Sequence, residues 1–443
     1  MAHLDLDLAR LRTTLPDRST DLLAALRVAI PHEKIDAALV ATGRREKRRR
    51  RLPSDLVIAL VIAMSLWAQN SLRQVFANLM DGWWESQQTG QPCVPAKSAL
   101  TKARQRVGPQ PLLALFRLLA RPVATPETIP QAFLGGLRLM AIDGTALDIP
   151  DSPANARVFG RITAGRGTAA FPAVQVMSLL ELGTHVLCDA TLRPCRHNEA
   201  PVGRQLLRSV GPGMLLLWDR AFHSYEMVQQ TLARGAHFLG RVPSPVRFAA
   251  EQVLADGSSL RTIHARQRKG LPTPPPIRVR IIEYTIDDPD RPHHGERQRL
   301  MTSLLDWQAF PALTLATLYH ERWEIETATD EMKTHQNARA VEIRSQRPRE
   351  VVQEVYGLLI AHLAIRIMMA CAATTRGIDP DRLSFTGAIC IIRRAVPRFQ
   401  RAQKDMSPLC SLISWLNWRV RSIRPARTES IRGSYGAQAC RIA

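Results

Sequence analysis

Acidic residues are scarce in this chain compared with basic ones. Its 443 residues include 39 Asp and Glu against 60 Lys and Arg, and the formal net charge is therefore +21. A positive field of this size has polyanions as its natural partners, and a small acidic substrate would not need it. We therefore expect a polyanionic partner.

Cysteine and aromatic residues are also few. The seven cysteines are odd in number, scattered and free of any C-x-x-C spacing, which argues against a disulfide framework and against a zinc site. Aromatics make up 5% and hydrophobic residues 45%, the composition of a globular protein rather than a fibre or a low-complexity tail. At roughly 100–200 residues per domain, the length predicts two to four domains.

Long uninterrupted apolar runs are missing. Residues 56–68 are too few to span a bilayer, and residues 355–373 carry His362 and Arg366 in their interior. Both segments are predicted to be buried helices, with no membrane contact. The N-terminus has Asp5 and Asp7 where a secretory signal has basic residues followed by an apolar stretch. We expect a cytoplasmic protein.

Residues 1–130 are predicted to form a helical N-terminal domain that binds nucleic acid. Apolar residues recur there at helical spacing. Residues 44–51 hold seven cations and one anion, and include Arg48, Arg49 and Arg50; we expect phosphate contact, although a solvated charged linker has the same composition. Residues 95–107 carry Lys102 and Arg104 on a short predicted helix, which fits either a helix-turn-helix reader or a basic surface helix.

After residue 130 the pattern changes to alternating strands and helices, which predicts an α/β sheet domain over residues 131–370. Strands are expected at 137–142, 174–182, 184–192, 214–218 and 237–242, with helices at 200–210 and 225–235. Residues 245–298 interrupt this order and are predicted to be an inserted β-rich subdomain. Residues 371–443 are predicted to be a basic helical C-terminal region and tail, with 11 Lys or Arg against 2 acids in residues 391–443.

Two aspartates follow apolar strands of the predicted sheet. Asp143 comes after the strand at 137–142, and Asp219 comes after the strand at 214–218. Open α/β sheets place their sites at the carboxyl ends of strands, so the two side chains should converge. One such acid alone is more often a helix cap or a turn former, and it is the pair that favours a site.

A third acid is expected near Tyr319, in the part of the chain that is predicted to be helical again from residue 311 onward. At about 100° per residue, Glu321, Glu324 and Glu331 point away from the face of Tyr319. The residues that share this face are Tyr319, Arg322, Trp323, Glu326, Asp330 and Lys333. Geometry alone leaves Glu326 and Asp330 as rivals, and a surface helix with charged pairs is the structural alternative.

Three carboxylates are hard oxygen ligands that suit Mg²⁺ or Mn²⁺. Two such ions about 4 Å apart can activate a water or a DNA 3′-hydroxyl and stabilise the leaving oxygen of a phosphodiester. On the same helix face, Arg322 would hold a phosphate as a bidentate fork and Lys333 as a point charge. Tyr319 would donate a hydrogen bond to the same backbone.

These residues resemble the insertion-element-4 type of DDE transposase. The most specific part is Tyr319-x2-Arg322-x3-Glu326-x6-Lys333, which matches the signature of that family in residue type and spacing. Asp143-Gly144-Thr145 and Leu217-Trp218-Asp219-Arg220-Ala221-Phe222 resemble its two aspartate motifs, with Ala221 where glycine is usual. The N-terminal half also looks like the N-terminal domain of the family.

The resemblance implies a ribonuclease-H-like mixed sheet with a β-rich insertion, flanked by an all-α N-terminal domain and a helical C-terminal region. It implies that Asp143, Asp219 and Glu326 are the catalytic metal ligands, which favours Glu326 over Asp330. It further implies Mg²⁺ as cofactor with Mn²⁺ able to substitute, double-stranded DNA as partner, and a homodimer in the synaptic complex. Related enzymes cut transposon ends through hairpins and join them to target DNA.

The resemblance also implies DNA contacts beyond the ligands. Tyr319, Arg322 and Lys333 would contact phosphates of the transposon end. A tryptophan commonly stacks on a base flipped out when the hairpin forms, and Trp307 and Trp323 are the two choices. Two other activities fit the sequence: a catalytically inactive, transposase-derived DNA-binding protein, and a metal-dependent nuclease of the same fold that cuts without joining. All three acidic residues are present together with Arg322 and Lys333, and an inactive protein would have no chemical reason to keep them.

Overall fold

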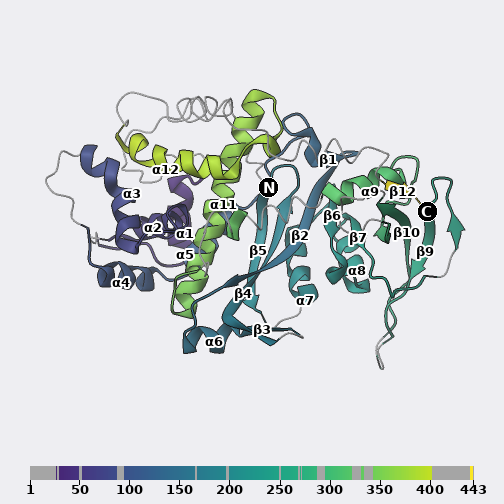
Figure 1. Cartoon of the computed structure of the whole chain (residues 1–443), viewed down its shortest axis with the longest axis horizontal. Coiled ribbons are helices and arrows are strands. Elements are labelled where there is room, and N and C mark those ends of the chain that lie inside the picture. The colour runs from purple at the N-terminus through teal and green to yellow at the C-terminus, as the bar shows by residue number, and fades with distance from the viewer. Residues whose placement is uncertain are drawn as a thin grey trace.

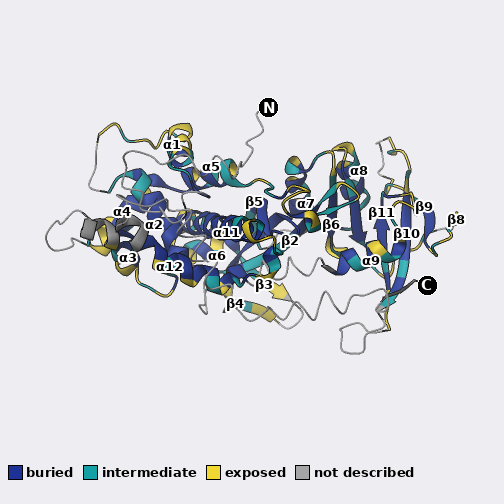
Figure 2. Ribbon diagram, turned by 90° about the horizontal axis from the view of Figure 1, so that it is seen from above, coloured by how far each residue is buried: buried dark blue, intermediate teal, exposed yellow. Residues whose placement is uncertain are grey.

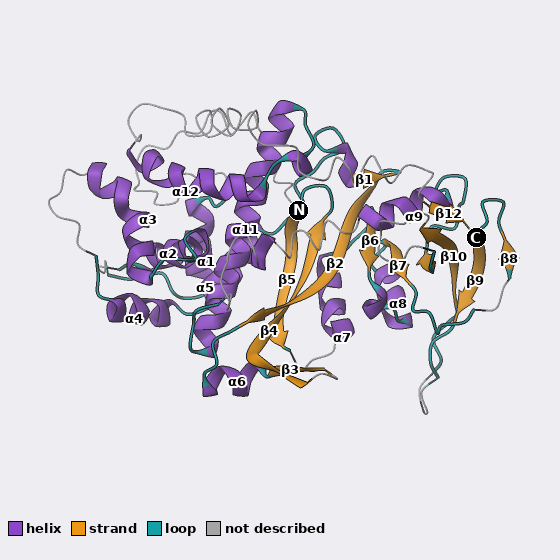
Figure 3. Ribbon diagram, in the orientation of Figure 1, coloured by secondary structure: helices purple, strands orange, loops and turns teal. Residues whose placement is uncertain are grey.

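The computed structural model describes most of the chain, as Figure 1 shows. The residues described are 26, 29–48, 52–86, 94–164, 167–195, 199–248, 251–267, 270, 272–286, 295–321, 331–333, 343–401 and 440–442. Within them, most helices gather at the left of Figure 3 and one large sheet occupies its centre and right. A long helix lies between the two.

The N-terminal part is helical, as predicted. Its helices are α1 (His32–Ala41), α2 (Ser54–Leu66), α3 (Leu72–Ser86), α4 (Lys97–Val107) and α5 (Gln110–Leu119). Pro53 precedes α2 and Asp55 lies in its first turn, a favourable start for a helix. Gly108 ends α4 with a φ of 71°, a left-handed conformation that glycine adopts without strain.

The centre of the sheet has a characteristic strand order. The neighbours are β5 (Val186–Pro194), β4 (Gly167–Glu181), β2 (Leu137–Asp148), β6 (Met214–Trp218) and β7 (His237–Arg241). Strand β4 is antiparallel to β2 and β5, whereas β2, β6 and β7 are parallel. Numbered along the chain, the order is 3-2-1-4-5 with the second strand reversed. This is a ribonuclease-H-like fold, which confirms the predicted fold class.

The segment after β7 extends the same sheet. Strand β11 (Arg297–Thr302) pairs antiparallel with β7, and β10 (Ile277–Ile286), β9 (Ser259–Ile263) and β8 (Gln252–Val253) follow in that order. Strand β12 (Cys440–Ile442) pairs with β10, while the short β1 (Phe133–Leu134) and β3 (Arg161–Ala164) pair with β2 and β4. The β-rich segment predicted at 245–298 therefore continues the sheet edge to edge.

Helix α11 (Pro348–Arg376) is the long helix between the two sides. It starts with Pro348 in its first turn and ends at Gly377, which is left-handed. Its length and composition would suffice to cross a membrane, but 94% of its most apolar window is buried inside the protein. Figure 2 shows it as a buried element. The prediction of a buried helix at 355–373 is confirmed.

The remaining helices cover the sheet and complete the core. They are α6 (Pro153–Phe159), α7 (Glu199–Gly203), α8 (Tyr225–Ala233), α9 (Ala312–Glu321) and α12 (Phe385–Arg401), with 3-10 turns η3 (Pro130–Ala132), η4 (Arg204–Ser209), η5 (Arg220–Phe222) and η7 (Pro380–Arg382). The helix predicted at 200–210 is thus a short α-helix followed by a 3-10 turn.

The two faces of the sheet pack against different helices. Ala141 and Leu217 belong to the large core that also contains residues of α9, α11 and the N-terminal helices. Ile142 and Trp218 belong to a second core with residues of η4 and α8. Since side chains alternate along a strand, residues 143 and 219 return to the face of Ala141 and Leu217. That face is the one covered by α9 and α11.

Candidate active site

Asp143 and Asp219 lie side by side at the end of a parallel strand pair. The register of β2 and β6 ends with Ile142 opposite Trp218, so each aspartate is the next residue on its strand. Neighbouring strands are about 4.8 Å apart, close enough for two carboxylates to share one ion. The convergence expected from the sequence is thus present in the backbone register.

Strand β2 is longer than the sequence predicted. It was expected to end at Ile142, but it runs to Asp148, because it keeps pairing with β4 after β6 has ended. Asp143 therefore lies within β2, opposite Ser178 of β4, and is partly buried. A carboxylate on a paired strand has a more fixed backbone than one on a turn, which suits a ligand position.

Tyr319 at the end of α9 reaches the same place. Its side chain is 5% exposed, and its hydroxyl lies 3.3 Å from the carbonyl oxygen of Trp218 and 3.4 Å from Oδ1 of Asp219. The hydroxyl can donate to either oxygen, so it holds the peptide and the carboxylate of the second aspartate motif. Tyr319, the first residue of the signature, therefore meets the second aspartate motif in the structure.

Other parts of the predicted site are only partly described. Lys333 is half-buried, next to the buried Met332. Arg322, Trp323 and Glu326 lie outside the described residues. Trp307 is half-buried in the turn before α9, at the opposite end of that helix from Tyr319. Which tryptophan faces DNA stays a prediction.

The donor set suits a hard divalent cation. Within the described ranges, no group of three or more His, Cys, Asp or Glu side chains is placed to hold a metal ion. Two of the three predicted ligands, Asp143 and Asp219, are adjacent in register, and both offer carboxylate oxygens. Oxygen donors at the carboxyl ends of these two strands suit a hard divalent cation.

The basic N-terminal segments occupy different environments. Arg48 and Lys102 are exposed, whereas Arg49 and Arg50 lie outside the described residues. Arg104, by contrast, is 5% exposed, and its guanidinium donates to Gln353 Oε1 at 3.0 Å and Ser345 Oγ at 3.0 Å. Arg104 thus ties α4 to α11, whereas Lys102 of the same helix faces solvent.

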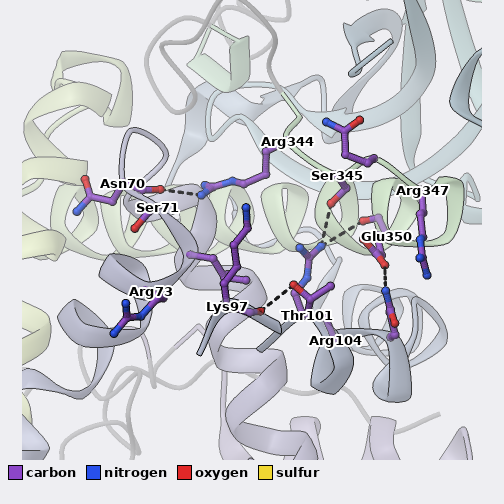
Figure 4. A pocket seen from close by; sticks show the side chains of 13 residues that line it. Asn70, Ser71, Arg73, Lys97, Thr101, Arg104, Arg344, Ser345, Arg347 and Glu350 are labelled. Atoms are coloured by element: carbon purple, nitrogen blue, oxygen red, sulfur yellow. Dashed lines mark hydrogen bonds between the residues drawn. The ribbon is translucent and has the colours of Figure 1, made fainter. Parts of the chain in front are cut away.

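A pocket of about 490 Å³ opens where α4 meets the start of α11 (Figure 4). Arg344 spans part of it, donating to the carbonyl oxygens of Asn70 and Met64 at 2.8 Å each. The cationic residues in its lining are Arg73, Lys97, Arg104, Arg344 and Arg347, against the single acid Glu350. The surface where the N-terminal helices meet the sheet side is therefore strongly positive.

Comparison with known proteins decides the family. A model described as "Transposase DDE domain" matches residues 134–364, a range that contains both aspartates and the whole signature from residue 319 to residue 333. A second model, "Insertion element 4 transposase N-terminal", matches residues 20–117. The chain belongs to the insertion-element-4 group of DDE transposases.

Two curated relatives of the transposase come from Escherichia coli (strain K12). Transposase InsG for insertion sequence element IS4 is 27% identical over 392 residues, which cover 87% of this chain and 86% of that protein. Putative transposase InsZ is 30% identical over 258 residues, covering 57% of this chain and 81% of that protein. The similarity thus extends over both the helical and the sheet parts of the transposase.

Among solved structures, the piggyBac transposase synaptic complex with hairpin DNA is similar with a TM-score of 0.45 and 12% identity, covering 92% of this chain and 86% of that chain. The strand order, and not this similarity, establishes the fold of the transposase. DDE transposase domains generally use a divalent metal, in agreement with the carboxylate oxygens of Asp143 and Asp219 at the carboxyl end of the β2–β6 pair.

Sequence reasoning missed one group of polar residues in the transposase. Glu331, which points away from the signature face on a helical wheel, is 4% exposed and bonded to Arg366 and His362 of α11. The available signal was the pair of polar residues, His362 and Arg366, inside an otherwise apolar helix. Such residues need buried partners of opposite charge.

Proposed function

We propose that this transposase cleaves the ends of its element and joins them to target DNA by two-metal phosphodiester chemistry. The observation that supports this most is the register of β2 and β6, which brings Asp143 and Asp219 next to each other with the hydroxyl of Tyr319 beside them. We further propose a cut-and-paste course through hairpin ends, as in the family that the sequence resembles.

In this proposal Asp143, Asp219 and Glu326 hold the divalent ions, Mg²⁺ in the cell with Mn²⁺ able to replace it. When bound, such ions activate a water or 3′-hydroxyl and stabilise the leaving oxygen. The protein itself aligns the carboxylates. Tyr319 contributes to this by hydrogen bonding at Asp219, which limits the rotation of that carboxylate.

The DNA is held by cations on both sides of the molecule. Arg322 and Lys333, on the signature segment, would bind phosphates near the cut. The Tyr319 hydroxyl would donate to a phosphate in place of the Trp218 carbonyl oxygen or the Asp219 carboxylate. Trp307 or Trp323 would stack on the flipped base. Farther away, the proposed contacts with the transposon end are Arg48, Arg49, Arg50 and Lys102. Arg104, which the sequence also suggests as a contact, is 5% exposed and bonded to Gln353 and Ser345, so its proposed role is to hold α4 against α11.

We also propose that two copies of the transposase assemble on two element ends, because a joining reaction needs both ends in one complex. The homodimer would then form on DNA. The bacterial relatives and the nucleic-acid partner both favour action in the cytoplasm, on the nucleoid.

The test is an incubation of the purified transposase with labelled element ends and a target plasmid in Mg²⁺. Strand-transfer products are the expected result. Cleavage without joining would replace the proposal with a metal-dependent nuclease. Binding without cleavage would replace it with a DNA-binding protein derived from a transposase.

The ligand assignment is tested with Asp143→Ala, Asp219→Ala and Glu326→Ala. Each variant should lose cleavage while binding element ends with nearly the affinity of the parent, measured by gel shift without divalent ions. The matched control is Asp148→Ala, on the same strand β2 but on the opposite face by alternation, and it should keep its activity. A variant that retains near-full cleavage would remove its residue from the ligand set.

A further inference from the structure

A buried ionic network joins the segment after Glu326 to three other parts of the fold. Glu331 accepts hydrogen bonds from Arg366 Nε at 2.9 Å and from His362 Nε2 at 3.1 Å, with a second, shorter contact from Arg366 Nη2. The same Nη2 donates to His185 Nδ1 at 2.7 Å, and His185 Nε2 lies 3.2 Å from Asp381 Oδ1. The network therefore connects residue 331 with α11, the β4–β5 turn and η7.

Solvent hardly reaches this network. Glu331 is 4% exposed, Arg366 3% and His362 0%. Phe385 of α12 covers it, with its ring centroid 5.2 Å from the His362 ring and 5.5 Å from the Arg366 guanidinium carbon. An ionised carboxylate in such a place is stable only when its partners stay in position, so the network has little freedom to shift.

The charge state of Glu331 agrees with this geometry. Burial alone would raise the pKa of its carboxyl, but Arg366 and the hydrogen bond from His362 lower that pKa to about 2. Glu331 is therefore an anion throughout the physiological range and binds Arg366 as a fork that fixes both position and orientation.

Glu326 lies between two anchored points of the chain. Seven residues before it, Tyr319 is fixed at Asp219, and five residues after it, Glu331 is fixed at α11. Five residues of chain span at most about 18 Å. A side chain at 331 that is bound to α11 therefore limits how far residue 326 can lie from that helix.

We propose that Glu331 is a positioning residue, which through Arg366 and His362 sets the orientation of the segment that carries Glu326 and Lys333. The proposal rests on the proposed function, because it takes Glu326 as the third metal ligand. Glu331 itself touches neither metal nor DNA. Its proposed role is to restrict the conformations of this segment before the metal binds. The third carboxylate then loses less conformational entropy on reaching the ligand position, an effect like that of residues that orient metal ligands from behind.

The test uses the full-length chain with Glu331→Gln, which keeps the shape of the side chain and removes its charge. The matched control is Asp189→Asn, at a buried carboxylate of β5 that also binds an arginine, Arg208 at 2.7 Å, and a hydroxyl, Ser209 at 2.7 Å. Arg366→Lys is a second variant, which keeps the positive charge and loses the guanidinium fork in case Glu331→Gln folds poorly.

Three quantities are measured for each variant: the unfolding temperature without metal, the Mn²⁺ concentration that half-saturates the rise in unfolding temperature, and the affinity for element ends without metal. We expect Glu331→Gln and Arg366→Lys to need about tenfold more Mn²⁺ or higher, with end affinity within about twofold of the parent. We expect Asp189→Asn to lose stability yet keep the Mn²⁺ midpoint of the parent.

Two other outcomes would each have a distinct meaning. If both network variants lose stability but keep the Mn²⁺ midpoint, as the control does, Glu331 is only structural and the inference is wrong. If the parent chain itself shows no Mn²⁺-dependent rise, and Asp143→Ala behaves like the parent, it is the proposed metal chemistry that fails. Cleavage titrated with Mg²⁺ should follow the same order as the Mn²⁺ midpoints.

Discussion

At the scale of single residues, the position of Asp219 depends on the side chain just before it. Trp218 is fully buried and stacks on Phe238 with ring centroids 5.0 Å apart. Across the strand pair it faces Gly240, whose missing side chain leaves room for the indole. The indole therefore fits between two residues of β7, and the peptide that follows it presents Asp219 to the site.

Gly240→Ala should consequently impair both stability and cleavage. A Cβ at residue 240 would lie 2.5 Å from Cε2 and 2.8 Å from Cδ1 of Trp218, so the indole or the strand would have to shift. Overpacking of this kind costs about 1–3 kcal/mol in unfolding free energy. Urea denaturation measures the loss, and the cleavage rate at saturating Mg²⁺ reports the displacement of Asp219.

Gly211→Ala is the control for this substitution, because a Cβ there meets no heavy atom within 4 Å. It should leave both the midpoint of denaturation and the cleavage rate unchanged. An unaltered cleavage rate in Gly240→Ala would mean that the position of Trp218 does not govern Asp219.

At the scale of elements, α2 and α11 approach each other unusually closely. A Cβ at Gly357 of α11 would lie 2.7 Å from Cγ1 and 2.9 Å from the carbonyl oxygen of Val61 in α2. Glycine inside a helix costs about 1 kcal/mol relative to alanine, so its presence here needs a packing reason. The close crossing of the two helices is that reason. A side chain could rotate away from a Cβ at residue 357, but the backbone carbonyl of Val61 in α2 cannot.

We therefore expect Gly357→Ala to destabilise the protein in spite of the better helix propensity of alanine. The net loss in unfolding free energy should be about 1 kcal/mol or more, because overpacking outweighs the gain in propensity. Chemical denaturation followed by circular dichroism measures it. A variant more stable than the parent would show that the two helices can separate without cost.

The polar network on α11 makes stability depend on pH in a definite direction. Burial lowers the pKa of His362 below its ordinary 6.5, so the unfolded chain takes up a proton there at a higher pH than the folded chain does. The pKa of Glu331 is lowered from 4.5 to about 2, so its stabilising charge is present above 4.5 and is lost as pH falls toward 2. Both groups favour unfolding as pH falls.

The expected result is a decline of stability that begins below about pH 6.5 and steepens below about 4.5. His362→Gln should flatten the upper part, between these two values, because the group that is protonated on unfolding is gone. Denaturation midpoints at pH 7.5, 6, 5 and 4 would show this. His32→Gln serves as control, since that side chain is 44% exposed in the folded chain, and it should follow the parent.

The elements also show how far the sequence predicted this molecule. Strand β6 was predicted with its observed bounds. The apolar run from 214 to 218 is limited by Gly213 on one side and by Asp219 on the other, so both ends are visible in the sequence. The end of β2 was missed, because Gly144 and Thr145 suggest a turn, whereas they pair with Met177 and Val176 of β4. Local pattern gives the strand, but its extent is set by a distant partner.

The same reason separates the predicted from the unpredicted parts of the site. The neighbourhood of Asp143 and Asp219 follows from strand order alone, and the structure has it. The role of Glu331 does not follow, because its partners Arg366 and His362 come more than 30 residues later and meet it only in the folded chain. The helical wheel predicted only that Glu331 points away from the face of Tyr319. Its actual partners are set by tertiary packing.

At the scale of the whole molecule, one core joins parts that the sequence divides. A single buried cluster runs through the N-terminal helices, the sheet, α9, α11 and α12. Helix α11 passes through the boundary predicted at residue 370. The predicted domains at 1–130, 131–370 and 371–443 therefore share their apolar surfaces, and the N-terminal helices are held at a fixed distance from the aspartates.

The net charge of +21 should make binding of element ends strongly dependent on salt. Each phosphate contact releases counterions, and the loss of one contact lowers the slope of log affinity against log salt by about 1. Lys102 is exposed on α4, beside the positive pocket at the start of α11. We expect Lys102→Ala to weaken binding and to reduce that slope by about 1, measured by fluorescence anisotropy between low and physiological salt.

The control distinguishes a contact from a change in the overall field. Arg234→Ala removes the same charge at an exposed position at the end of α8, on the opposite face of the sheet from α9 and α11. A group that touches no phosphate acts only through the long-range field, which is largely screened beyond about 10 Å at 0.1 M salt. Arg234→Ala should therefore leave the slope nearly unaltered when the slope is measured around that salt concentration. Equal slopes for the two variants would place DNA elsewhere than on α4.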